Sequence, residues 1–190
     1  MRVFYFFVQH NTNMYLWQND HLIDELSHHG IEIVIFNPLH YESLEQANEK
    51  ARVLLNAEHF DLFMTGETEK ICYKETVNYA KEKGIPTLLY CFDSLMMPLR
   101  HKHMAPLFDL VMISQKDVHG YFRSYNSNVI VSHYAANPYF FRMQQPATEE
   151  LSICFPGTPY GSRMAEIKKL AEAGISVSLY YNKGEKKQDD

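Results

Sequence analysis

The stretch HGIEIVIF, residues 29–36, joins the end of a predicted helix to an apolar run through Gly30. Residues 83–85 (KGI) and 173–175 (AGI) repeat the same junction. Glycine closes a helix in the left-handed conformation at little cost, and a short apolar run directly after it is typical of a buried strand. These helix–glycine–strand junctions predict tight right-handed β-α-β units and a parallel sheet.

Apolar runs alternate with helical stretches on either side of these junctions. The predicted strands are residues 3–8, 31–36, 60–65, 86–92, 109–114 and 128–132. Helices are predicted at residues 16–29, 68–83 and 115–124, and another behind the capping box formed by Ser43 and Gln46. The alternation predicts an α/β fold, a Rossmann-like parallel sheet with helices on both faces.

The sequence divides into parts of different character. Residues 1–137 form the predicted Rossmann-like domain, residues 138–150 a linker with two prolines, and residues 182–190 a charged, disordered tail. Residues 151–181 hold a partial β-α-β unit, which is too small to be stable alone. We expect this unit to pack on the first domain, to pair with another chain, or to begin a domain that is cut short.

Composition excludes several classes of protein. Of the 190 residues 46% are hydrophobic and 22% charged, which rules out a long disordered region. The net charge is −5, so the chain lacks the excess positive charge with which proteins bind nucleic acid or an anionic membrane. Three widely spaced cysteines fit no disulfide framework, and the first apolar run is too short for a signal peptide or a spanning helix. We expect a cytoplasmic protein without a membrane span.

Ligands of open α/β sheets bind beyond the carboxyl ends of the strands, so the polar loop after the first strand is a candidate site. It contains His10, Asn11 and Asn13 and lacks the G-x-G-x-x-G fingerprint of dinucleotide binding. His10 is a candidate general base or hydrogen-bond donor to substrate. Alternatively, Asn11 or Asn13 simply caps the following helix.

Other strand ends supply further candidates. Asp93 and Ser94 follow the fourth strand, where a carboxylate either acts as a base or caps the next helix. Gly66, His133 and Asn137 are candidate substrate-binding residues at the same predicted edge.

The histidines His101 and His103 are considered as metal ligands. They are two residues apart, and this spacing does not place both on one helix face. No other group of residues has the spacing of metal ligands, so no metal site is expected.

The loop PGTPYGSR, residues 156–163, links a predicted strand to a helix. Backbone N–H groups at a helix N-terminus bind anions, and an arginine adds a charge-assisted hydrogen bond. Gly157, Thr158, Ser162 and Arg163 are therefore candidate diphosphate-binding residues. The alternative is a short turn with Ser162 as the helix N-cap.

Several segments in this order resemble the GT-B glycosyltransferases, and most closely the CgeB-like branch near the group 1 and family 4 enzymes. They are DLVMIS (residues 109–114), YAANPYFFR (134–142), CFPGTPYGSR (154–163) and GISV (174–177). The resemblance implies that residues 1–137 are the acceptor-side domain and that the donor-side domain begins near residue 151. It places the 157–163 turn near the diphosphate of a nucleotide-sugar donor and gives His10 an acceptor-handling or catalytic role.

An enzyme of this family transfers a glycosyl group from a nucleotide sugar to an acceptor and needs neither a cofactor nor, in principle, a metal. Helix N-termini, which are the positive ends of helix dipoles, and basic side chains offset the negative charge of the departing diphosphate. The chain ends before the donor-domain residues that hold the nucleotide, so we expect an incomplete donor site. The alternative is a non-catalytic α/β interaction or nucleotide-binding module that forms homodimers through its second unit.

Overall fold

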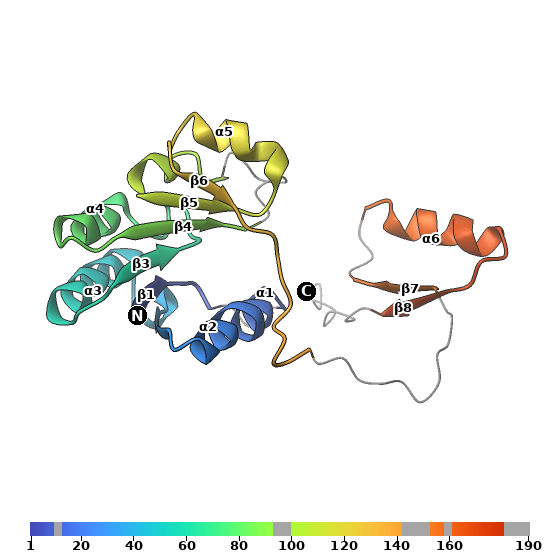
Figure 1. Ribbon diagram of the computed structural model, residues 1–190, viewed down its shortest axis with the longest axis horizontal. Coiled ribbons are helices and arrows are strands. Elements are labelled where there is room, and N and C mark those ends of the chain that lie inside the picture. The colour runs from blue at the N-terminus through green and yellow to red at the C-terminus, as the bar shows by residue number, and fades with distance from the viewer. Residues whose placement is uncertain (10–12, 93–99, 142–152, 158–160, 181–190) are drawn as a thin grey trace. The chain divides into compact units, whose positions relative to one another are not determined.

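The computed structural model describes residues 1–9, 13–92, 100–141, 153–157 and 161–180 of the chain. These residues belong to two compact units, residues 1–142 and residues 143–190 (Figure 1). Each unit has its own parallel sheet. No helix in the described ranges is long and apolar enough to cross a bilayer.

The first unit is built on a six-stranded sheet whose strands all run parallel, which confirms the predicted α/β class. The strands are β1 (Arg2–Phe6), β2 (Glu32–Phe36), β3 (Leu62–Thr65), β4 (Thr87–Cys91), β5 (Leu110–Ile113) and β6 (Val129–Val131). Their order across the sheet is β2-β1-β3-β4-β5-β6. The N-terminal strand therefore lies inside the sheet, with a neighbour on each side.

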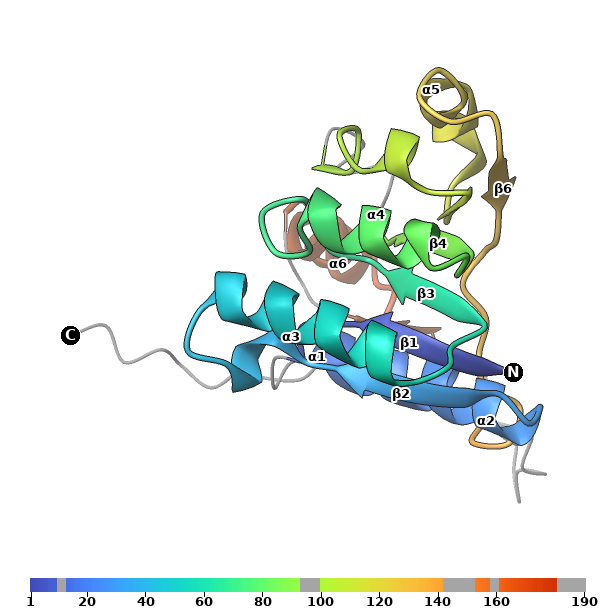
Figure 2. The same ribbon diagram turned by 90° about the vertical axis from the view of Figure 1, so that its left-hand side faces the viewer.

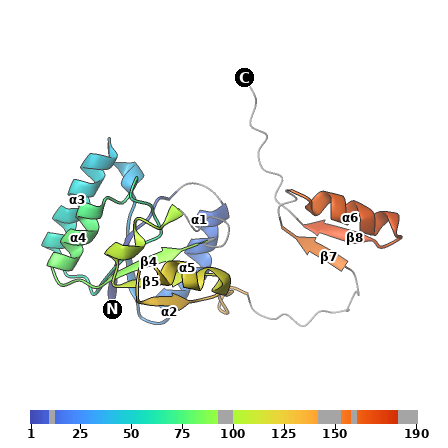
Figure 3. The same cartoon turned by 90° about the horizontal axis from the view of Figure 1, so that it is seen from above.

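Helices cover both faces of this sheet, as predicted. They are α1 (Asn13–Gln18), the π-helix η1 (Asn19–Ile23), α2 (Asp24–His28), η2 (Pro38–His40), α3 (Leu44–Ala57), α4 (Lys74–Glu82), η4 (Ala105–Leu107), η5 (Lys116–Val118) and α5 (His119–Arg123). The helices α3, α4 and α5 pack on one face, and α1 with η1 packs on the other. Figures 2 and 3 show α3 and α4 side by side.

Strand β1 is apolar and buried from Val3 to Phe6 because both of its faces are covered there. Phe4 and Phe6 point to the side of α3 and α4, whereas Val3 and Tyr5 point to the side of α1 and η1. The ring of Phe4 stacks on Phe63 with centroids 5.5 Å apart and contacts two further phenylalanine rings. Aromatic rings therefore fill most of the core around β1.

Local sequence signals determine where several elements begin and end. The Ser43 hydroxyl accepts a hydrogen bond from Gln46 N at 3.1 Å, and the Gln46 side chain accepts one from Glu42 N at 3.0 Å, which confirms the cap predicted for α3. Gly30 and Gly84 have φ angles of 71° and 73°, so they close their helices in the left-handed conformation as predicted.

Asn48 is a polar residue that lies fully buried on α3. Its Nδ2 donates to the carbonyls of Leu44 and Ile71, both at 2.8 Å. Its Oδ1 accepts from Tyr73 N at 2.9 Å and from the Thr76 hydroxyl at 2.8 Å. This one amide therefore joins α3 to the segment that leads into α4.

The second unit contains β7 (Ile153–Pro156), α6 (Arg163–Glu172) and β8 (Val177–Tyr180), and its two strands are parallel. Gly174 closes α6 with a φ of 79°. None of its described residues is buried. The predicted tail and the predicted linker beyond residue 141 lie outside the described residues.

Candidate functional site

The carboxyl edge of the six-stranded sheet is the candidate site. Strand β1 has β2 on one side and β3 on the other, so the chain changes direction across the sheet at the boundary between β1 and β3. In open parallel sheets the crevice at such a point is where ligands bind.

Backbone and side-chain hydrogen bonds join the strand ends at this edge. After β1, Val8 N donates to Glu67 Oε1 at 3.2 Å. Gln9 N donates to Asn37 Oδ1 at 3.4 Å, and Glu67 N donates to Thr65 Oγ1 at 3.0 Å. The loops that follow β1, β2 and β3 are thereby held together at the switch point.

Glu67 is a carboxylate with only 8% of its surface exposed, and sequence reasoning did not select it. The pKa of Tyr5 and that of the Cys72 thiol are both raised. Burial is the larger cause, and the negative charge of Glu67 is the next. Burial likewise raises the pKa of Cys91. Both thiols are therefore protonated near neutral pH and neither is an activated nucleophile. The available signal was the position of Glu67, two residues after the end of a buried strand.

Gly66 is placed where a side chain does not fit. A Cβ on this residue would lie 3.0 Å from the carbonyl oxygen of Tyr90 and 3.2 Å from the ring of Phe92. Its carbonyl oxygen accepts a hydrogen bond from His101 Nε2 at 2.9 Å. The predicted site residue Gly66 therefore brings β3, β4 and the chain around His101 into close contact.

Substituting Gly66 with alanine is expected to lower the free energy of unfolding by about 1–3 kcal/mol, because overpacking forces the backbone of β4 or the Phe92 ring to move. Urea unfolding measures this change. Gly120→Ala in α5 is the matched control, since nothing lies within 4 Å of the added Cβ, and it should stabilise the protein by up to about 1 kcal/mol. Equal stability of Gly66→Ala and the wild type would contradict the close packing described here.

An aromatic group borders the same edge of the sheet. The ring of Trp17 lies 6.0 Å from that of Phe92 and 5.1 Å from that of Tyr134. Phe92 also contacts Tyr90, whose pKa burial raises to about 12. These rings come from three separate parts of the chain, namely α1, the end of β4 and the segment after β6.

Residues 133–141, here called the return segment, run from β6 to α1 and α2 (Figure 1). Asn137 in this segment is fully buried. Its Nδ2 donates to Asp20 O at 2.7 Å and to Asp24 Oδ2 at 2.9 Å, and its Oδ1 accepts from Tyr139 N at 2.8 Å. The structure thus gives this predicted substrate-binding residue a structural role.

Histidine side chains complete the attachment of the return segment. Asn137 N donates to His21 Nδ1 at 2.9 Å. The ring of His21 stacks on Phe141 at 5.0 Å, and that of His28 stacks on Tyr139 at 3.9 Å. The first residues of the predicted linker are therefore packed on η1 and α2.

The remaining candidates of the first unit are placed as follows. His133 is exposed after β6, and Asn13 is the first residue of α1. His10, Asn11, Asp93 and Ser94 lie outside the described residues, as does Thr158 of the second unit. Within the described ranges no group of three or more His, Cys, Asp or Glu side chains is arranged to hold a metal ion.

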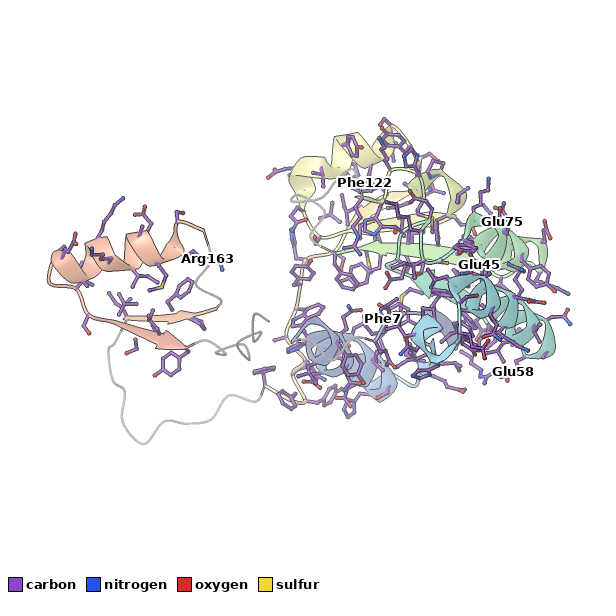
Figure 4. The ribbon with its side chains drawn as sticks, turned by 180° about the vertical axis from the view of Figure 1, so that it is seen from behind. Phe7, Glu45, Glu58, Glu75, Phe122 and Arg163 are labelled. Carbon is purple, nitrogen blue, oxygen red and sulfur yellow. The ribbon has the colours of Figure 1, made fainter. Side chains whose placement is uncertain are left out.

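In the second unit the turn after β7 brings a glycine and an arginine together. Gly157 has a φ of 148°, and its N–H donates to Tyr180 O at 2.9 Å. Arg163 begins α6 (Figure 4), with Nη1 4.0 Å from where a Cβ on Gly157 would lie. Ser162 occupies the N-cap position of α6, as the alternative interpretation predicted, but its side chain makes no capping hydrogen bond.

Neither a model of a known protein family nor a curated protein matches this sequence.

Proposed function

We propose that this chain is part of a GT-B glycosyltransferase, comprising the acceptor-side domain and the start of the donor-side domain. The observation that carries the proposal is the succession of two Rossmann-like pieces, a parallel sheet with a polar carboxyl edge and a β-α-β unit with a glycine–arginine turn. The reaction is transfer of a sugar from a nucleotide sugar to an acceptor hydroxyl.

Each group of candidate residues has a role in this proposal. The turn that contains Gly157, Thr158, Ser162 and Arg163 binds the diphosphate of the donor through N–H groups at the start of α6 and the guanidinium of Arg163. His10 and Asp93 are the proposed catalytic residues, as a base or as groups that orient the acceptor. The three cysteines are free thiols, which fits a reducing, cytoplasmic setting.

Titration of the full chain with UDP and with GDP, followed by NMR, tests the donor part of this proposal. We expect weak binding that Arg163→Ala reduces at least about tenfold, equivalent to about 1.4 kcal/mol. Lys168→Ala is the matched control, because Lys168 is a highly exposed cation on the same helix. Absence of binding, or equal loss in both variants, would contradict the assignment of the turn.

A self-associating module is a second candidate, favoured by the apolar surface of the second unit. Ile153 of β7 and Tyr180 of β8 are 54% and 64% exposed, and Met164 and Leu170 of α6 are exposed as well. A two-stranded sheet with one helix needs a further layer to bury such side chains.

Sedimentation velocity over a range of concentrations tests this second candidate. We expect a concentration-dependent dimer that Ile153→Lys and Tyr180→Lys convert to a monomer, because charge opposes burial of this surface. Val53→Lys is the control, since Val53 is an equally exposed residue (56%) on α3 of the first unit. A wild-type protein that is monomeric at every concentration would contradict self-association.

A further inference from the structure

The attachment of the return segment to η1 includes a hydrogen bond whose acceptor is a histidine. Asn137 N donates to His21 Nδ1 at 2.9 Å, and Asn137 is fully buried. A backbone N–H can only donate, so His21 Nδ1 carries a lone pair and not a proton. His21 is therefore neutral, with its proton on Nε2, whenever the return segment is attached in this way.

Protonation of His21 removes this acceptor. An imidazolium carries a proton on both ring nitrogens, so Nδ1 becomes a donor that faces the N–H of Asn137. Turning the ring over does not restore an acceptor, because it brings a C–H group to the same place. Histidine is the side chain whose charge ordinarily changes between pH 5 and 8, so this conflict falls in the physiological range.

Other titratable groups lie on the elements that meet at this contact. In the described residues they are Tyr15 in α1, Asp20 in η1, Asp24, Glu25 and His28 in α2, His29 directly after α2, and His133, Tyr134 and Tyr139 in the return segment. Between pH 5 and 8 carboxylates are ordinarily charged and tyrosines neutral. The negative charge of the carboxylates favours the imidazolium of His21, but it does not give Nδ1 back its lone pair.

A second histidine, His28, contacts the return segment directly. Its ring stacks on Tyr139 at 3.9 Å, and its Nε2 lies 3.5 Å from Asp24 Oδ2. Protonation of His28 strengthens both contacts and so opposes release. The two side chains of this ion pair are 42% and 49% exposed, so solvent screens their attraction and its contribution is small. The loss of the acceptor at His21 therefore determines the direction of the pH effect.

We propose that the return segment is a pH-sensitive strap, which neutral His21 holds on η1 and protonated His21 releases. The attached state excludes a proton that the detached state binds, so attachment is strongest above the ordinary histidine value of about 6.5 and weakens as the pH falls through it. Well below that value it weakens about tenfold per pH unit. Release also separates the rings of Tyr134 and Trp17, which are 5.1 Å apart, so acid opens the aromatic border of the candidate site.

Amide hydrogen exchange of the full chain, followed by NMR between pH 8 and pH 5, tests the strap. The protection factor of Asn137 N–H compares its exchange rate with that of an unstructured peptide at the same pH. It should fall about thirtyfold from pH 8 to pH 5. The protection factor of Phe63 N–H, which donates to Pro86 O within the sheet, should change far less, because no histidine takes part in that bond.

Three variants separate the charge of the histidine from its hydrogen bond. His21→Asn places an amide oxygen near the position of Nδ1, and because this oxygen accepts without titrating, the protection of Asn137 N–H should be independent of pH. His28→Asn is the matched control and should keep the thirtyfold fall seen in the wild type. His21→Phe has no acceptor and should give low protection at every pH, which keeps the test valid if His21→Asn does not rebuild the bond.

The outcomes decide whether His21 is the switch. A fall in the wild type that His28→Asn retains and that His21→Phe lacks supports the strap. Protection of Asn137 N–H that follows that of Phe63 N–H at every pH overturns it, as does a fall that persists in His21→Phe. Loss of the fall in His28→Asn also overturns it, because the pH dependence would then rest on His28.

Discussion

Replacing Asn137 with aspartate is expected to detach the return segment from η1 and α2. The amide group that donates to Asp20 O and Asp24 Oδ2 becomes a carboxylate oxygen facing two acceptors. An uncompensated buried charge of this kind costs about 3–5 kcal/mol. Trp17, the only tryptophan, packs on Tyr134 of the return segment, so its fluorescence should change with detachment.

Two further variants make this prediction specific. Asn137→Ala removes the donors without adding charge and should cost less than Asn137→Asp. Asn78→Asp introduces the same charge at an exposed position on α4 and should change the stability by no more than about 0.5 kcal/mol. If Asn137→Asp leaves both the Trp17 emission and the urea midpoint as in the wild type, the attachment of the return segment described here is incorrect.

Asn48→Ala is expected to lower the free energy of unfolding by about 3 kcal/mol, because it removes four hydrogen bonds that each contribute about 0.5–1.5 kcal/mol. The groups that lose a bond are two carbonyls, the N–H of Tyr73 and the hydroxyl of Thr76. Urea unfolding followed by circular dichroism measures the change.

Asn56→Ala is the control for this second prediction. Asn56 lies near the end of the same helix, and its Oδ1 accepts hydrogen bonds from exposed Tyr79 and Lys83 side chains. The same substitution there should change the stability by only about 0.5 kcal/mol, as for most surface positions. Similar effects at Asn48 and Asn56 would show that the buried network around Asn48 contributes little.

The alternation of strands and helices was predictable from local signals. The glycine junctions at Gly30 and Gly84 predicted where helices end, and the capping box predicted where α3 begins. The order of the strands was not predictable, because pairing depends on contacts between residues far apart in the sequence, such as Val3 with Leu62.

Long-range hydrogen bonds also explain where the predicted helices differ from the structure. A single helix was predicted over residues 68–83, but α4 begins at Lys74 because Tyr73 N bonds to Asn48 rather than to a helical carbonyl. The helix predicted over residues 16–29 contains the π-helix η1, and from it His21 accepts a hydrogen bond from Asn137 N.

The candidate site was predictable only in part. The carboxyl edge of the sheet follows from the parallel topology, and Gly66 was selected there. His101 was considered only as one half of a metal pair, because its hydrogen bond to Gly66 spans 35 residues. Asn137 was selected from its position after the last strand, and its partners on α2 and η1 are more than a hundred residues earlier.

The position of β1 inside the sheet has a consequence for how the chain folds during synthesis. Once β2 and β3 have left the ribosome, β1 has both of its neighbours, and β4, β5 and β6 are then added in the order in which they are made. The return segment is made after all six strands and binds helices that were synthesised first. Its attachment to these N-terminal helices therefore requires a chain synthesised through residue 141.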